Sequence, residues 1–157
     1  MAFNQYNPDK PAKYCMLFKS LNDARLTYTY QSLVYAGKPK KEPSPFFISR
    51  TQNYVKELVT KLESHVSLQG RNISTDRLYI SIPIAMWLLK KNITCIGTLQ
   101  SNRVGIPDEA KSIKERENYS SWMHWEKEHG DLSITSYVVP SGKGKRNVLK
   151  KGLILTG

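Results

Sequence analysis

The sequence predicts an α/β domain in which helices flank a mixed sheet. A strand, a helix and a second strand follow one another over residues 72–99, an amphipathic helix precedes them, and short β-prone runs stand on either side. Strands that alternate with helices are typical of parallel pairing through a crossover helix, which lies on a face of the sheet. With 157 residues the chain has room for one domain with a modest core.

Two short strands are predicted near the N-terminus. Residues 15–21 form an apolar-rich run, which is typical of a buried strand, and this strand ends close to Asp23. Residues 27–35 are rich in Tyr, Thr and Val and predict a second strand. Residues 38–45 carry three prolines among charged side chains and predict a loop.

A helix is predicted to begin at Thr51. Apolar residues recur there at three- and four-residue spacing, and charged residues occupy the opposite side. The apolar positions are Tyr54, Val55, Leu58, Val59, Leu62 and Val66. Gly70 closes the connection to the next strand.

The next stretch predicts a βαβ unit. Residues 72–75 are short and β-prone, Ser81 is a suitable N-cap, and Pro83 fits a first helical turn because no hydrogen bond from its nitrogen is needed there. A helix over residues 83–91 and a strand over residues 93–99 complete the unit.

The last third of the chain predicts a hairpin. Residues 131–139 read as a strand, and residues 122–125 are its expected partner across the turn at residues 126–130. Residues 108–117 alternate acidic and basic side chains and predict a solvated helix.

Two carboxylates stand where predicted strands end. Asp23 follows the first strand and Asp76 follows the strand over residues 72–75, and each strand is expected to be central in the sheet. Side chains at neighbouring strand ends can converge, and a pair of carboxylates is the core of a two-metal phosphoryl-transfer site with Mg²⁺. The alternative is that both residues are turn formers or helix caps, which is common for Asp at strand ends.

The chain is basic, with 24 Lys and Arg residues against 13 Asp and Glu and a formal net charge of +11. This excess favours a polyanionic partner, since each neutralised phosphate releases counterions. The alternative is a basic surface that only keeps the protein soluble. Binding to a membrane surface is less favoured, because no predicted helix joins a continuous basic face to an apolar one.

Two groups of residues are candidates for DNA contact. Asn102 and Arg103 lie just beyond a predicted strand, on the same expected face as the two carboxylates. Lys38, Lys40 and Lys41 could follow a phosphate backbone, and the alternative for this Pro-broken loop is simple solvation.

The remaining notable side chains are predicted to be structural. Cys15 and Cys95 lie in apolar runs and read as small buried hydrophobes in a reducing compartment. Trp87, Trp122 and Trp125 are predicted to belong to the core rather than to stack on bases. The first residues lack the features of a signal peptide, and no run approaches the roughly 18 apolar residues of a membrane span.

Several sequence blocks occur together in this chain. They are residues 5–14, which hold the Lys-Pro-Ala-Lys-Tyr entry, then 21–23, 35–37, 54–55, 72–76, 81–83, 88–89 and the run Gly97-Thr98-Leu99-Gln100-Ser101-Asn102-Arg103, followed by Ile106-Pro107. In combination, these blocks resemble the catalytic core of piggyBac-type transposases. The resemblance covers residues 5–148 as a partial core and leaves residues 149–157 as a divergent C-terminal tail.

The resemblance implies an RNase H-like fold, with a mixed sheet flanked by helices that is incomplete at its C-terminal side. It also implies DNA cutting through an Asp triad with Mg²⁺, in which Asp23 matches the first Asp and Asp76 the second. The family's third Asp lies far downstream, beyond the last residue of this chain. Among the other acids, Asp108, Glu109, Glu115, Glu117 and Asp131 are not favoured as a replacement, because the first four fit a solvated helix.

The expected function is therefore that of a fragment of a cut-and-paste DNA transposase. We expect it to be inactive as this chain, with weak or absent Mg²⁺ binding. The implied partners are transposon-end DNA and a second copy or a full-length relative, and the implied location is the nucleus. The alternative is a transposon-derived remnant that binds DNA or protein without catalysis.

Overall fold

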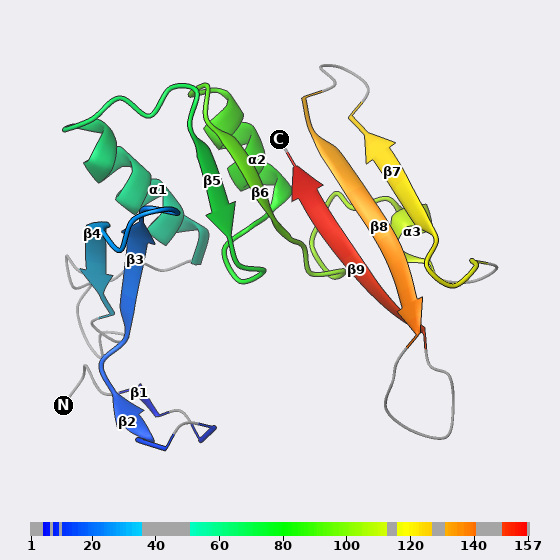
Figure 1. The fold of residues 1–157 in the computed structure, drawn as a ribbon, viewed down its shortest axis with the longest axis horizontal. Helices are drawn as coiled ribbons and strands as arrows, with labels where there is room; N and C mark the ends of the chain where they lie inside the picture. The colour runs from blue at the N-terminus through cyan, green and yellow to red at the C-terminus, as the bar shows by residue number, and fades with distance from the viewer. Residues whose placement is uncertain are drawn as a thin grey trace. The chain divides into compact units, whose positions relative to one another are not determined.

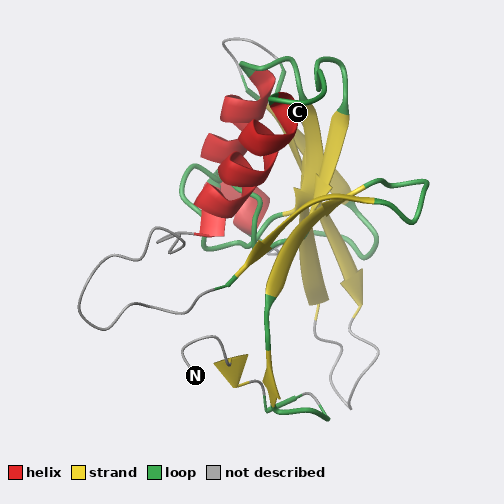
Figure 2. Cartoon of the chain, turned by 90° about the vertical axis from the view of Figure 1, so that its left-hand side faces the viewer, coloured by secondary structure: helices red, strands yellow, loops and turns green. Residues whose placement is uncertain are grey.

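The computed structural model describes residues 5–6, 8–9, 11–35, 51–112, 116–126, 131–140 and 149–156. The chain divides into two units, Met1–Ser67 and Leu68–Gly157 (Figure 1). Each unit has its own hydrogen-bonded strands and helices, which Figure 2 distinguishes by colour. No helix in the described ranges is long and apolar enough to cross a membrane.

The first unit contains two small antiparallel ladders and one helix. Strand β1 (Gln5–Tyr6) pairs with β2 (Tyr14–Cys15), and β3 (Phe18–Asn22) pairs with β4 (Thr29–Val34). Helix α1 (Thr51–Glu63) packs against β3 and β4. The second strand and the helix are confirmed, and residues 38–45 lie outside the described residues.

Helix α1 forms because its apolar positions fall on one side of the helix. Five of the six predicted positions are buried, namely Tyr54, Val55, Leu58, Val59 and Leu62. Val66 lies beyond the end of the helix and is exposed. The three- and four-residue spacing therefore predicted the buried face of the helix correctly, but it predicted a helix about one turn too long.

A strand ends next to Asp23 as predicted, but residues 15–21 do not form one buried strand. Two residues that are not in a strand separate β2 from β3, and the side chains of Met16 and Phe18 are 54% and 53% exposed. Cys15 is only half-buried. The reason is that β3 belongs to a two-stranded ladder, in which only alternate side chains point to the covered face.

The second unit holds a mixed sheet of five strands in the order β5-β6-β9-β8-β7. The strands are β5 (Asn72–Thr75), β6 (Thr94–Thr98), β7 (Ser121–Trp125), β8 (Ser133–Pro140) and β9 (Leu149–Thr156). Strands β5 and β6 are parallel, and the other neighbours are antiparallel. The mixed sheet and the hairpin of β7 and β8 agree with the sequence prediction.

Helix α2 (Ile82–Leu89) connects β5 to β6 and packs on β6, so the βαβ unit is confirmed. Its buried residues belong to the core of this unit, as do Ile80, Ile93 and Cys95. Ser81 occupies the N-cap position as predicted, but its hydroxyl makes no capping hydrogen bond. Burial raises the pKa of the Cys95 thiol to about 11, so this cysteine stays protonated and acts as a packing residue.

Several strand placements differ from the prediction. Strand β5 stands at the end of the strand order of this sheet, and β3 lies in a separate two-stranded ladder, whereas a central position was expected for both. Strand β9, for which no strand was predicted, lies between β6 and β8. Periodicity reports which faces of a strand are apolar and not which strands become its neighbours, so it could not show these placements.

The predicted solvated helix at residues 108–117 is short, and one of its members is buried. Helix α3 covers only Asp108–Lys111, and Arg116 is 6% exposed. The Arg116 guanidinium donates to Oγ and to the carbonyl oxygen of Ser136 (2.7 and 2.9 Å) and to the carbonyl oxygen of Ser120 (3.2 Å). Arg116 therefore ties the segment after α3 to the hairpin.

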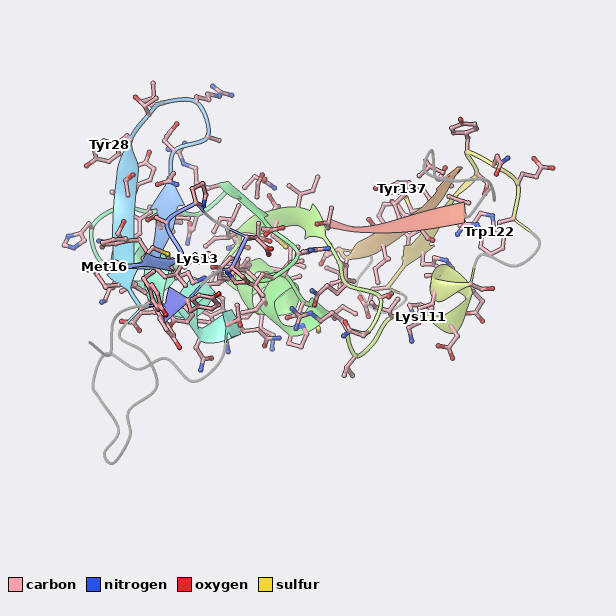
Figure 3. All side chains as sticks on the ribbon, turned by 90° about the horizontal axis from the view of Figure 1, so that it is seen from below. Lys13, Met16, Tyr28, Lys111, Trp122 and Tyr137 are labelled. Atoms are coloured by element: carbon pink, nitrogen blue, oxygen red, sulfur yellow. The ribbon has the colours of Figure 1, made fainter. Side chains whose placement is uncertain are left out.

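The tryptophans of β7 are not core residues, which corrects the prediction. Trp122 is 44% exposed and Trp125 is 63% exposed. The Arg116 guanidinium carbon lies 4.5 Å from the centroid of the Trp122 ring, so one ring face is covered by a cation. The Trp122 side chain is labelled in Figure 3. Strand β7 stands at the end of the strand order, where one side of each ring lacks a neighbouring strand to cover it.

Candidate functional site

Asp23 follows β3 directly and organises the turn to β4. Its Oδ1 accepts hydrogen bonds from the backbone N–H groups of Arg25 and Leu26, both at 2.8 Å. Its Oδ2 accepts the hydroxyl of Tyr30 at 2.7 Å, and its own N–H donates to the carbonyl oxygen of Tyr28. In the structure Asp23 is thus a turn former, which was the alternative interpretation of the sequence.

These hydrogen bonds hold the pKa of the Asp23 carboxyl below its usual value. The hydroxyl of Tyr30 has the largest effect, followed by the backbone N–H groups of Leu26 and Arg25. All three donors stabilise the ionised form. Asp23 therefore carries a full negative charge at neutral pH, as a ligand of a divalent cation must.

Replacing Tyr30 by Phe is expected to raise the pKa of the Asp23 carboxyl toward its ordinary value. The stabilisation from this carboxylate is present above the unfolded-state pKa and is lost as the pH falls through the lower folded-state pKa. Tyr30→Phe should therefore narrow the pH range between the unfolded-state and folded-state pKa values of Asp23, over which this stabilisation is lost. NMR of the Asp23 side-chain carboxyl carbon, recorded across the acid pH range, measures the change in its pKa.

Tyr28→Phe is the matched control, because Tyr28 also lies beside this turn and its ring contacts the Tyr30 ring. Its hydroxyl makes no hydrogen bond to Asp23, so the pKa should not move. An unchanged Asp23 pKa in Tyr30→Phe would show that the tyrosine hydroxyl is not the main cause.

Asp76 follows β5 and opens a tight turn. Its carbonyl oxygen accepts the N–H groups of Tyr79 (2.9 Å) and Ile80 (3.3 Å), and Ile80 is fully buried. Its Oδ1 accepts the N–H of Arg77 at 2.6 Å. The carboxylate is exposed, and no described residue donates a hydrogen bond to its Oδ2. The turn therefore presents one carboxylate oxygen to an outside ligand.

The segment after β6 reaches the Asp76 turn. Because β5 and β6 are parallel, their carboxyl ends lie at the same edge of the sheet. Arg103 Nη2 donates to the carbonyl oxygens of Leu78 (3.0 Å) and Arg77 (3.4 Å). The structure thus brings Arg103 to this turn, and its neighbour Asn102 is exposed.

The other predicted site residues lie in separate units, outside the described residues or on the protein surface. Asp23 and Asp76 belong to different units, so their convergence stays a prediction. Lys38, Lys40 and Lys41 lie outside the described residues. Asp108, one of the spare acids, is almost fully exposed and pairs with Lys111 at 2.9 Å, which lowers the pKa of its carboxyl.

The donor chemistry of the two Asp residues suits Mg²⁺. Carboxylate oxygens are the ligands that this hard cation prefers, and an ionised carboxylate offers about four lone-pair positions. The free Oδ2 of Asp76 satisfies this need, and Asp23 Oδ2 keeps a lone pair beside its bond from Tyr30. Within the described ranges, His, Cys, Asp and Glu side chains form no group of three or more that could hold a metal ion.

Sequence reasoning missed two contacts in this site. The first is the bond from Tyr30 to Asp23, which the register of the β3–β4 hairpin would have suggested. The second is the hydrogen bond from Arg103 to the backbone that follows Asp76, for which the sequence carries no signal.

Comparisons with known proteins find two matches. A family model described as Transposase IS4 matches residues 1–140. The cryo-EM structure of the piggyBac transposase synaptic complex with hairpin DNA is similar at 29% sequence identity and a TM-score of 0.75. That match covers 99% of this chain and 29% of the transposase chain, so this chain spans less than a third of its length. A search of curated proteins finds no match.

Proposed function

This chain belongs to the Transposase IS4 family, and we propose that it forms part of the catalytic core of a piggyBac-like DNA transposase. The resemblance that the sequence blocks indicated is confirmed by the family match and by the structural match. We further propose that the mixed sheet and its helices belong to an RNase H-like core. The TM-score of 0.75 over nearly the whole chain supports this assignment.

The observation that carries the proposal is the geometry of Asp76. It stands at the carboxyl end of a parallel strand pair, on a turn fixed by backbone hydrogen bonds, with one carboxylate oxygen open. Asp23 and Asp76 would hold Mg²⁺, which in this chemistry stabilises the attacking and leaving oxygens of a phosphoryl transfer. Asp23 brings a carboxylate whose ionised form is already favoured.

The substrate in this proposal is DNA at transposon ends. The net charge of +11 supports it, because counterion release favours a basic chain on a phosphate backbone. Asn102 is exposed beside the Asp76 turn and is proposed to contact DNA, together with Lys38, Lys40 and Lys41. Arg103 lies in the same segment. A second copy or a full-length relative would be the protein partner, and the nucleus would be the location.

One observation favours the alternative of a remnant that binds DNA or protein without catalysis. Both carboxylate oxygens of Asp23 already accept hydrogen bonds in the β3–β4 turn, so structure alone can explain this residue. The two Asp residues also provide two negative charges for a pair of ions that carries four. We therefore propose that these 157 residues, as a separate polypeptide, lack the strand-transfer activity of the whole transposase.

A cleavage assay tests this proposal. The purified 157-residue polypeptide is expected neither to nick nor to join DNA carrying piggyBac-type TTAA ends, with Mg²⁺ or Mn²⁺, because two carboxylates do not complete a metal pair. Asp23→Asn and Asp76→Asn should give the same blank result. A full-length piggyBac-type transposase on the same DNA serves as the positive control.

The contrary outcome is equally clear. If the wild-type polypeptide cleaves and Asp23→Asn or Asp76→Asn abolishes cleavage, another acid of the chain supplies the third ligand. The proposed inactivity would then be wrong, while the proposed roles of Asp23 and Asp76 would stand.

A further inference from the structure

We infer that Arg103 is a positioning residue, whose guanidinium fixes the turn that presents the Asp76 carboxylate. The sequence predicts Arg103 as a DNA contact, on the strength of its place after a strand. Its contacts point to a different task. The inference rests on the proposed function only where it concerns a bound cation, because the hydrogen bonds of Arg103 to the turn are a property of the fold.

The guanidinium acts on the backbone next to Asp76. Nη2 donates to the carbonyl oxygens of Leu78 and Arg77, the two residues that follow most closely after Asp76 in the turn. A hydrogen bond from a charged donor is stronger than one between neutral groups. No ion pair joins Arg103 to the Asp76 carboxylate within the described residues, so the carboxylate stays available to a cation.

Arg103 is itself held by the segment that carries it. Its backbone N–H donates to the carbonyl oxygen of Gln100 at 3.1 Å, and Ile106 anchors the segment in the core. Gly105 has φ +88°, and a Cβ there would lie 2.9 Å from Cδ1 of Ile82 at the start of α2. The segment therefore lies against the first turn of α2.

Close packing at Gly97 brings the ends of β5 and β6 together. A Cβ on Gly97 would lie 2.5 Å from the carbonyl oxygen of Thr75 and 2.8 Å from Cδ1 of Ile80. Glycine is needed at this position, because any side chain would push the Asp76 turn away from β6. The turn is thus fixed at its base by Gly97 and Ile80 and on its outer side by Arg103.

The orientation of the guanidinium removes one of its two bidentate edges from phosphate contact. Arginine binds phosphate through two parallel N–H groups, for which the edge formed by Nε and one Nη is well suited. In Arg103 the Nε atom is buried with no hydrogen-bond partner in the described part of the chain, and Nη2 is engaged by the two carbonyl oxygens. The Nε–Nη2 edge therefore faces the protein rather than solvent.

Hydrogen exchange of single amides tests the inference. The N–H groups of Tyr79 and Ile80 close the Asp76 turn, so Arg103→Ala should speed their exchange about tenfold, as expected for loss of a charge-assisted hydrogen bond. Arg103→Lys keeps one donor and should give an intermediate rate. Arg77→Ala is the matched control, since it removes an exposed positive charge from the same turn and should leave both rates unchanged.

Mn²⁺ affinity adds a readout that general destabilisation does not move. Water-proton relaxation should show weaker Mn²⁺ binding in Arg103→Ala, and no change in Arg116→Ala, which disrupts a buried arginine elsewhere in the same unit. If Arg103→Ala fails to fold, Arg103→Lys provides the comparison. Failure of the wild-type chain to bind Mn²⁺ would overturn the proposed roles of Asp23 and Asp76 as metal ligands, whereas the exchange rates would still decide the role of Arg103.

DNA affinity at several salt concentrations gives the opposing result. If Arg103 is a positioning residue, Arg103→Ala should show the same slope of log affinity against log salt as Arg77→Ala. Unchanged exchange at Tyr79 and Ile80, together with a slope reduced by about one unit relative to Arg77→Ala, would overturn the inference and make Arg103 a phosphate contact.

Discussion

The affinity of this chain for mixed-sequence duplex DNA is expected to fall roughly 500-fold between 50 and 200 mM salt. The estimate assumes about five phosphate contacts, which give a slope near −4.5 for log affinity against log salt. The net charge of +11 provides enough cations for these contacts. Fluorescence anisotropy with a labelled duplex, repeated at four salt concentrations, measures the slope.

Substitutions separate the proposed contacts from general charge. Replacing Lys38, Lys40 and Lys41 together by Ala should reduce the slope by about three units. A control with Lys56, Lys61 and Lys90 replaced by Ala removes the same charge from exposed positions on α1 and just after α2, and should reduce the slope less. A flat salt response in the wild-type chain would leave the basic surface as a solubility feature.

Local pattern was sufficient to predict the elements that bury one continuous face. Helix α1 was predicted because its apolar residues recur at helical spacing, and the unit β5-α2-β6 was predicted because a β-prone run, a capping position and a proline follow in order. The hairpin of β7 and β8 followed from two apolar runs around a short polar connection. In each case the signal lies within one continuous stretch of sequence.

Long-range pairing was not predictable in the same way. Strand β9 begins Leu-Lys-Lys-Gly, which has no clear alternation, and it forms because β6 and β8 provide a ladder on each side. The exposure of Trp122 follows from the place of β7 at the end of the strand order, and the burial of Arg116 follows from acceptors on Ser136. Such contacts join residues whose separation carries no sequence signal.

The candidate site was predictable in its residues more than in their roles. The two carboxylates follow strands as the sequence indicated, since an Asp at a strand end is visible in the pattern. The hydrogen bond from Tyr30 to Asp23 and the hydrogen bond from Arg103 to the carbonyl oxygen of Leu78 depend on how the chain folds around them. Those contacts determine how each carboxylate is charged and presented, and only the folded chain shows them.

The second large effect concerns the proposal that Asp23 and Asp76 share one weakly bound divalent cation. Removing either carboxylate should weaken Mn²⁺ binding by at least about tenfold, because a hard cation loses one of two anionic ligands. The double substitution should weaken it little further than the stronger single one, since the first loss already dismantles the shared site. Glu109→Gln, which removes a charge from exposed helix α3, is the control and should leave the affinity unchanged.

The most direct test of the account is paramagnetic broadening of amide NMR signals by Mn²⁺. The N–H groups of Leu26 and Arg77 each bind the carboxylate of one of the two Asp residues and therefore report on it. If the two residues share one ion, it should broaden both signals in parallel, and Asp23→Asn or Asp76→Asn alone should abolish the broadening of both. Broadening of one signal without the other, or a substitution that affects only its own neighbour, would contradict a shared metal site.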